Sequence, residues 1–298
     1  MGTAAPAAHT IQGVHAFMIF RKPMLTAAAI MMTAGAVACG TDLAGPATLT
    51  DAQIDADIAA TSGDAVASQI TSFSDNVAAA GSFSMVAPNY NVNVGSGKTA
   101  YNGISPTCTY TSGRYSCSAT TEQGLSVTRS FAFYDANGTT VQTWDPAVVE
   151  SVNFQAQMDG DFSQGLVWMA SVHRTADLTV SGLISSAPQR TWNGTGTGNE
   201  SISHIGLDGI RSLSGTSSLT VTNVVMPGKD ATSQIPLSGT IAIDVDYTAS
   251  LQGATGSVSK EVTRHVAVTF DGTNAPALQI GSLHCVVHLD IHSVDSCQ

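Results

Sequence analysis

The sequence is poor in basic residues. Lys and Arg together number 11 against 22 Asp and Glu, which gives the 298-residue chain a formal net charge of −11 at pH 7. Because nucleic-acid binding depends on basic patches that neutralise phosphates, this balance argues against a nucleic-acid partner. Apart from one segment near the amino terminus, no apolar run approaches the roughly 20 residues that a transmembrane helix needs.

Motifs of several enzyme classes are absent or broken. The sequence contains no Gly-x-Ser-x-Gly nucleophile elbow and no helical His-Glu-x-x-His zinc motif. Gly95–Thr99 is similar to the end of a phosphate-binding loop, but Val92 stands where the first glycine is required. Residues 159–170 begin like a calcium loop, yet the glycine is one place late and Ala170 occupies the last ligand position. We therefore expect a protein that is not an enzyme and that holds no cofactor.

A short export signal is visible near the amino terminus. Arg21 and Lys22 precede the apolar run Met24–Ala38, which ends in three small residues directly before Cys39. A basic region, an apolar core of about 14 residues and small residues at the cut are typical of a signal peptide, and the run is too short to span a bilayer permanently.

With Cys39 directly after Ala36-Val37-Ala38, this segment resembles the lipobox of bacterial lipoproteins. The resemblance implies that residues 1–38 are removed and that Cys39 is acylated, so that membrane lipid anchors the exported chain at the cell envelope. Gly40 is similar to the residue that follows the cysteine in lipoproteins sent to an outer membrane, which favours its periplasmic side. Residues 1–17 carry none of this pattern, and Met18 begins a conventional precursor, which indicates an over-extended start.

The other four cysteines form an even set suited to disulfides outside the cytoplasm: Cys108, Cys117, Cys285 and Cys297. A two-residue turn at 112–113 places Cys108 opposite Cys117 at a non-hydrogen-bonded site, where the Cα atoms of antiparallel strands approach within disulfide reach. By elimination the other two cysteines pair with each other. Their direct opposition requires a three-residue turn at 290–292.

The mature chain divides into a tether at 39–49, a helical segment at 50–80 and a β domain at 81–298. Thr50-x-x-Gln53 is a capping-box pattern, and apolar residues then recur at helical spacing. Gly63 is expected to kink or split the helix.

From about residue 100, Thr, Ser, Val and Gly alternate between turn pairs such as Asn137-Gly138, which is typical of antiparallel strands. Several expected strands exceed the usual five or six residues. The predicted fold class is mainly β, a long-stranded antiparallel meander or half-barrel with a short N-terminal helical segment. The expected strands lie at 105–111, 114–119, 124–135, 139–144, 148–158, 167–181, 189–204, 210–225, 237–249, 257–270, 276–280 and 283–291.

Arginines fall on the apolar face of several expected strands. Because residues two apart in a strand share a face, Arg129 lies on the same side as Val127 and Phe131. The same parity holds for three further arginines: Arg174, Arg211 and Arg264. An unpaired buried guanidinium is costly, so these side chains are expected to reach the sheet rim, to pair with acids such as Asp135 or Asp177, or to meet an anionic ligand. The last alternative predicts a concave apolar surface ringed by cations, suited to an acyl chain with an acidic headgroup.

The final expected strand carries polar residues on one face. His288, Asp290 and His292 are spaced two apart, so neighbours lie about 6.6 Å apart along that face. Alternate residues on a strand can bind a transition metal, which makes these three a candidate metal site. A solvent-exposed outer face predicts the same residue types, and a straight strand holds the ligands too far apart.

These features favour a non-enzymatic exported lipoprotein that binds a hydrophobic or lipid ligand on a concave sheet. The expected architecture resembles the half-barrel lipoprotein carriers and lipid-binding lipoproteins over residues 50–298, without a diagnostic motif, and fold likeness alone does not assign function. The alternative is a surface or envelope assembly or adhesion protein whose sheet edges pair with a partner. A wide apolar pocket rimmed by Arg129 and Arg264 favours the carrier. A flat sheet with two polar faces favours assembly.

Overall fold

The computed structural model describes residues 48–82, 108–122, 125–164, 168–184, 187–206, 208–228, 231, 233–295 and 297–298. This part of the chain forms a helix, α1 (Asp51–Ser82), and a sheet of 14 strands. The strands are β1 (Cys108–Thr111), β2 (Arg114–Cys117), β3 (Thr120–Glu122), β4 (Leu125–Tyr134), β5 (Thr140–Val141), β6 (Ser151–Gln164), β7 (Trp168–Ser181), β8 (Gln189–Gly206), β9 (Gly209–Pro227), β10 (Ser238–Gly253), β11 (Gly256–Phe270), β12 (Ala277–Ile280), β13 (Leu283–His288) and β14 (Ser293–Val294). The predicted signal peptide, Cys39 and Gly95–Thr99 lie outside the described residues.

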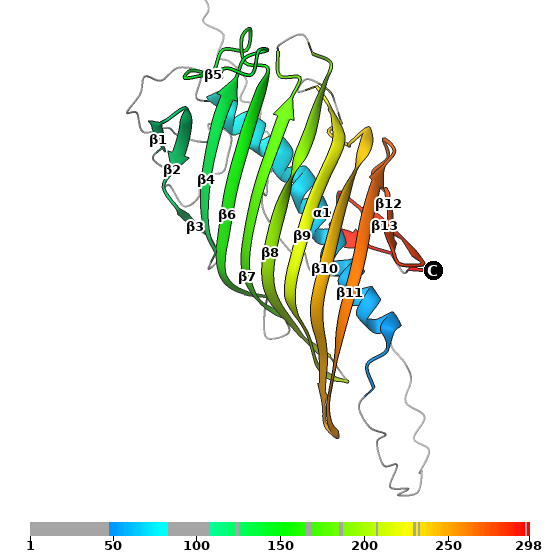
Figure 1. Ribbon diagram of the computed structural model, residues 1–298. Helices are drawn as coiled ribbons and strands as arrows, with labels where there is room; N and C mark the ends of the chain where they lie inside the picture. Colours follow the sequence, from blue (N-terminus) through cyan, green and yellow to red (C-terminus); the bar gives the residue numbers. More distant parts are fainter. Residues whose placement is uncertain are drawn as a thin grey trace, which may run out of the picture.

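The sheet is an open antiparallel meander. Its strands follow chain order from β1 to β14, except that β3 and β5 each pair with β4 beside the main path. The central strands are long, and β9 alone has 19 residues. Helix α1 runs diagonally across one face of the sheet, which we call the inner face (Figure 1). The predicted fold class, a mainly β meander with an N-terminal helix, is confirmed.

Alternation along the strands separates the inner face from the outer face. In β10, Ile241, Val245 and Tyr247 are buried, whereas Asp244 and Asp246 between them are exposed. Because side chains of a strand point alternately to the two faces, the apolar set meets α1 and the polar set meets solvent. This pattern fixes the register of the long strands, since a slip of one residue exposes the apolar set.

Helix α1 begins at the predicted capping box. The amide of Thr50 donates to Gln53 Oε1 at 3.0 Å, and the amide of Gln53 donates to Thr50 Oγ1 at 3.2 Å. Two of the amides that lack partners in the first helical turn are thereby satisfied. The helix then continues for 32 residues without a break.

Gly63 does not split the helix. A Cβ atom at this position would lie 2.2 Å from Cγ2 of Val294 and 3.5 Å from Cγ2 of Val287. The glycine therefore lets α1 approach the C-terminal hairpin closely, and the expectation that it splits the helix is wrong.

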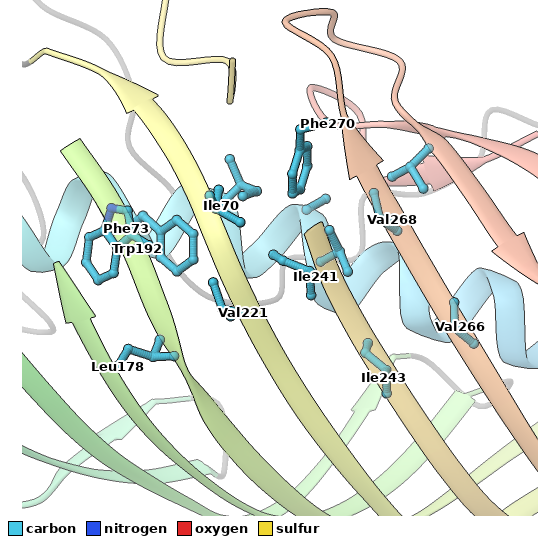
Figure 2. Packing of buried hydrophobic residues seen from close by; sticks show 14 of the residues in the cluster. Ile70, Phe73, Leu178, Trp192, Val221, Ile241, Ile243, Val266, Val268 and Phe270 are labelled. Carbon is cyan, nitrogen blue, oxygen red and sulfur yellow. The ribbon is translucent and has the colours of Figure 1, made fainter. Parts of the chain in front are cut away.

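Aromatic stacking joins the helix to the centre of the sheet. The ring of Phe73 on α1 stacks on Trp192 of β8 with centroids 4.2 Å apart, and Trp192 in turn stacks on Phe154 of β6 at 5.8 Å. Figure 2 shows Phe73 and Trp192 side by side, with Ile70 of the same helix near Val221 of β9. Phe73 and Trp192 are each 1% exposed, so this contact is part of the hydrophobic core.

The hairpin at the first edge of the sheet, β1–β2, forms with the predicted register and disulfide. Cys108 pairs in register with Cys117 and is bonded to it, with Cα atoms 3.9 Å apart. The two turn residues Ser112 and Gly113 both have positive φ, 53° and 84°. This is the conformation that a two-residue hairpin turn of type I′ requires.

The hairpin at the second edge, β13–β14, has a register that differs from the predicted one. Cys285 and Cys297 form the predicted disulfide. However, His288 pairs with Ser293, so the turn between β13 and β14 spans the four residues 289–292 instead of the expected three. The register shifts further on, where His284 and Gln298 exchange backbone hydrogen bonds of 3.0 Å, and this shift brings the cysteines together.

Candidate functional site

A cavity of about 140 Å³ lies between α1 and the inner face. Ala156 and Ala176 are cross-strand neighbours on that face and line the cavity, and Gly196 continues the same cross-strand row on β8. A Cβ atom at Gly196 would lie only 2.7 Å from the carbonyl oxygen of Thr175, so the strand needs glycine there. Small side chains on the adjacent strands β6 and β7 thus leave an open volume beneath the helix.

The walls of the cavity are mostly apolar, with one polar end. The apolar residues come from five strands and include Val127, Phe154, Met158, Leu178, Leu219 and Ile243. The helix contributes small or polar residues: Thr61, Ser62, Ala65, Ser68 and Gln69. An apolar pocket with a few convergent polar groups is the usual form of a small-molecule site.

The polar end is a buried network of three side chains. Arg174 donates from Nε to Glu200 Oε2 at 2.9 Å and also from Nη2 to the same oxygen, while the Tyr247 hydroxyl donates to Glu200 Oε1. The Glu200 side chain is only 3% exposed. Its carboxylate is therefore held by several donors inside the protein.

The pKa values of this network follow from burial and pairing. Burial alone would raise the pKa of Glu200, but the positive charge of Arg174 and the hydrogen bonds outweigh it and hold this pKa below its usual value. Burial, together with the neighbouring Glu200 carboxylate, raises the pKa of the Tyr247 hydroxyl, so the tyrosine stays protonated as a donor. The network thus consists of a directly paired cation and anion, with a neutral hydroxyl that donates to the anion.

The four candidate arginines do not converge on one site. Arg174 lines the cavity, whereas Arg211 pairs with Asp57 of α1 at 3.0 Å and Arg264 donates to Asp55 of α1 at 2.6 Å. Arg129 does not line the cavity but a neighbouring groove of about 530 Å³ over β2, β4 and β6–β8, which shares Ala156, Thr175, Ala176 and Thr197 with it. The pocket is therefore not rimmed by Arg129 and Arg264 as expected for a carrier of acidic lipids.

The acids expected to pair with these arginines have other partners. Asp135 accepts the amides of Asn137 and Thr139 in a turn, and Asp177 accepts hydrogen bonds from Asn153 and Gln155. Arg174 pairs instead with Glu200, and Arg211 and Arg264 pair with aspartates of α1.

The sequence analysis did not predict that aspartates on the first two turns of α1 pair with cations of the sheet. Asp51 binds Lys260 at 2.6 Å, which lowers the pKa of Asp51, and burial raises the pKa of Asp57 despite its pairing with Arg211. A usable signal was present: Asp51 and Asp55 are four apart on one helix face, and Lys260 and Arg264 are four apart on one strand face.

The three candidate metal ligands, His288, Asp290 and His292, do not converge on one site. His288 pairs with Asp295 at 2.9 Å, while His292 lies in the turn with a positive φ of 52° and contacts Asp64 of α1 at 3.5 Å. Strand β13 ends at His288, so the three residues 288, 290 and 292 do not share one strand face. Within the described residues, no group of three His, Cys, Asp or Glu side chains is arranged to hold a metal ion.

Comparison of the chain with protein-family models, with curated proteins and with solved structures returned no match. In the described part of the chain, no helix combines the length and the apolar character needed to cross a lipid bilayer.

Proposed function

We propose that this chain is an exported lipoprotein, anchored through an acylated Cys39, that binds an apolar or lipid ligand without catalysing a reaction. The observation that carries the proposal is the apolar cavity between α1 and the inner face, with the Arg174–Glu200–Tyr247 network at its polar end. Disulfides at both sheet edges are consistent with an oxidising compartment outside the cytoplasm.

The size of the cavity limits the ligand. An apolar cavity of about 150 Å³ accepts a molecule the size of benzene, so about 140 Å³ accommodates a short apolar group or one end of an acyl chain. Val127 and Met158 line the cavity and also belong to a second apolar cluster with Val172 and Ile202. These residues extend the apolar wall of the cavity along the inner face.

The paired state of Arg174 shapes the expected headgroup. Because Glu200 already neutralises this guanidinium, the network has no net charge to attract an acidic headgroup. A neutral polar group, such as an ester or a hydroxyl, is the better match for the cavity end.

Native mass spectrometry of protein purified gently from its own membrane tests this proposal. Wild-type protein should carry a lipid of defined mass, and Ala176→Phe should lose it because the aromatic ring enters the cavity. The matched control is Thr220→Phe on the exposed outer face of β9, which should retain the lipid. Wild-type protein without lipid, or an unchanged lipid load in Ala176→Phe, contradicts the proposal.

The same spectra address the alternative of assembly through sheet edges. The edge strands β1 and β14 have only four and two residues, and a disulfide fastens the chain beside each of them. Short edges are a device that prevents strand addition. However, β12 pairs only with residues 266–269 of β11, so within the described chain residues 256–265 of β11 have no strand partner on that side and form an edge at which strand addition can be tested. A ladder of oligomers would favour it.

A further inference from the structure

A second cavity, of about 380 Å³, lies on another side of α1. Three segments far apart in the sequence build it: α1 with Asp57 and Asp64, the β8–β9 hairpin with His204 and Arg211, and the turn before β14 with His292. It shares only Thr61 with the lining of the apolar cavity. The two cavities are therefore separate sites.

This second cavity holds an unusual pair of buried polar atoms. Among the described residues, two buried side-chain atoms have no hydrogen-bond partner, Oδ1 of Asp64 and Nε of Arg211, and both residues line this cavity. Native proteins satisfy nearly all buried polar groups, so each exception needs a physical explanation. Here an acceptor and a donor without partners belong to two residues that line the same cavity.

Neighbouring side chains do not satisfy either atom. The Asp64 side chain is 6% exposed, and its nearest charged contact is Nδ1 of His292 at 3.5 Å, which attracts the carboxylate only when the imidazole is protonated. Nε of Arg211 is 3.9 Å from Oδ2 of Asp208, beyond hydrogen-bonding distance, while Nη1 is used by Asp57. Among the described residues, no Lys or Arg side chain pairs with the carboxylate of Asp64.

The charge inventory defines the chemistry of a ligand. Among the described residues at this site, the three carboxylates of Asp57, Asp64 and Asp208 outnumber the one guanidinium, that of Arg211. A positively charged donor complements Asp64, and an acceptor oxygen complements the free Nε–H of Arg211. We infer that this cavity binds a small organic cation whose ammonium group meets Asp64 and whose oxygen meets Arg211.

Titration of the full chain with ethanolammonium, monitored by NMR of the His292 and His204 imidazole signals, tests the inference. Ethanolammonium should shift these signals saturably, whereas neutral ethylene glycol and anionic glycolate, of similar size, should not. Asp64→Asn keeps the shape of the side chain and removes its charge, so it should weaken ethanolammonium binding at least about tenfold. The control Asp246→Asn removes the same charge from the exposed outer face of β10 and should leave binding unchanged.

Each other outcome overturns the inference. No saturable shift with ethanolammonium means that the cavity does not bind the cation. Equal shifts with ethylene glycol mean that charge is not recognised. Equal affinity in Asp64→Asn places any binding elsewhere. None of these results depends on whether lipid occupies the apolar cavity, so the two proposals fail or stand separately.

Discussion

Arg174→Met is the most informative perturbation of the apolar cavity. The substitution keeps an unbranched side chain in the wall but removes the cation that donates to Glu200. Glu200 is 5% exposed and cannot turn to solvent without disrupting β8. Removal of one partner of a buried ion pair leaves an uncompensated charge and costs about 3–5 kcal/mol of folding free energy.

The dependence of this cost on pH distinguishes lost charge pairing from lost packing. In the wild type, the lowered pKa of Glu200 stabilises the fold above the ordinary value of 4.5, and this stabilisation is lost as pH falls through the folded-state pKa. In Arg174→Met, burial is no longer opposed by the guanidinium, so it raises the folded-state pKa of Glu200. Protonation of Glu200 at low pH then removes the unpaired charge and restores part of the variant's stability. The stability difference between the two proteins should therefore shrink on acidification from about pH 7 to about pH 4.

Urea unfolding with intact disulfides, followed by tryptophan fluorescence at each pH, measures this difference. Comparison of the two proteins at the same pH cancels the contributions of other carboxylates. The double variant Arg174→Met/Glu200→Gln should return to within about 1 kcal/mol of wild type, because the amide needs no cation and still accepts from Tyr247. A stability loss in Arg174→Met that stays constant with pH would falsify the assignment of Glu200 as a buried anion held by Arg174.

Three further predictions concern the helix and the anchor. Gly63→Ala should destabilise the fold by about 1–3 kcal/mol through the clash with Val294. In a Val294→Ala background the same substitution should instead stabilise the fold by up to about 1 kcal/mol. Urea midpoints of the four proteins measure both effects, and additive effects contradict the close contact. Phe73→Ala should cost about 3–5 kcal/mol and change the fluorescence of Trp192, on which the ring stacks; an unaltered midpoint excludes this contact from the core. Cys39→Ser should abolish incorporation of labelled palmitate, and equal labelling of both chains refutes acylation at that residue.

The hairpins show which parts of the fold were predictable from sequence. At the first edge, the turn residues Ser112 and Gly113 adopt the positive φ values that fix the pairing, so the sequence specifies both register and disulfide. At the second edge, the turn length depends on the positive φ of His292, a conformation that its residue type permits without requiring. The disulfide was still predicted, because only two cysteines remained, but its register was not.

Contacts between the helix and the sheet were not predictable in the same way. Arg264 and Asp55 are 209 residues apart, and the parity of a strand says which face a residue occupies without saying what lies above it. Parity correctly placed Arg174 and Arg211 on the inner face, and the docking of α1 then decided which cations have helical partners. For the same reason the second cavity, which joins α1 to the β8–β9 hairpin and to His292, has no signature in any single segment.

Two independent stretches of sequence keep the apolar cavity open. On the sheet, Ala156 and Ala176 are cross-strand neighbours that line the cavity, although the next row holds the large residues Phe154 and Leu178. On the helix, small residues at positions 62, 65 and 68 line the same volume. A closed, empty cavity of about 140 Å³ would cost on the order of 3 kcal/mol at roughly 24 cal/mol per Å³, and because this pocket is partly open to solvent its cost lies below that bound. One larger apolar side chain in either stretch would recover part of that energy. A sequence that keeps small residues in both layers is therefore better explained by a ligand that occupies the space than by the needs of folding.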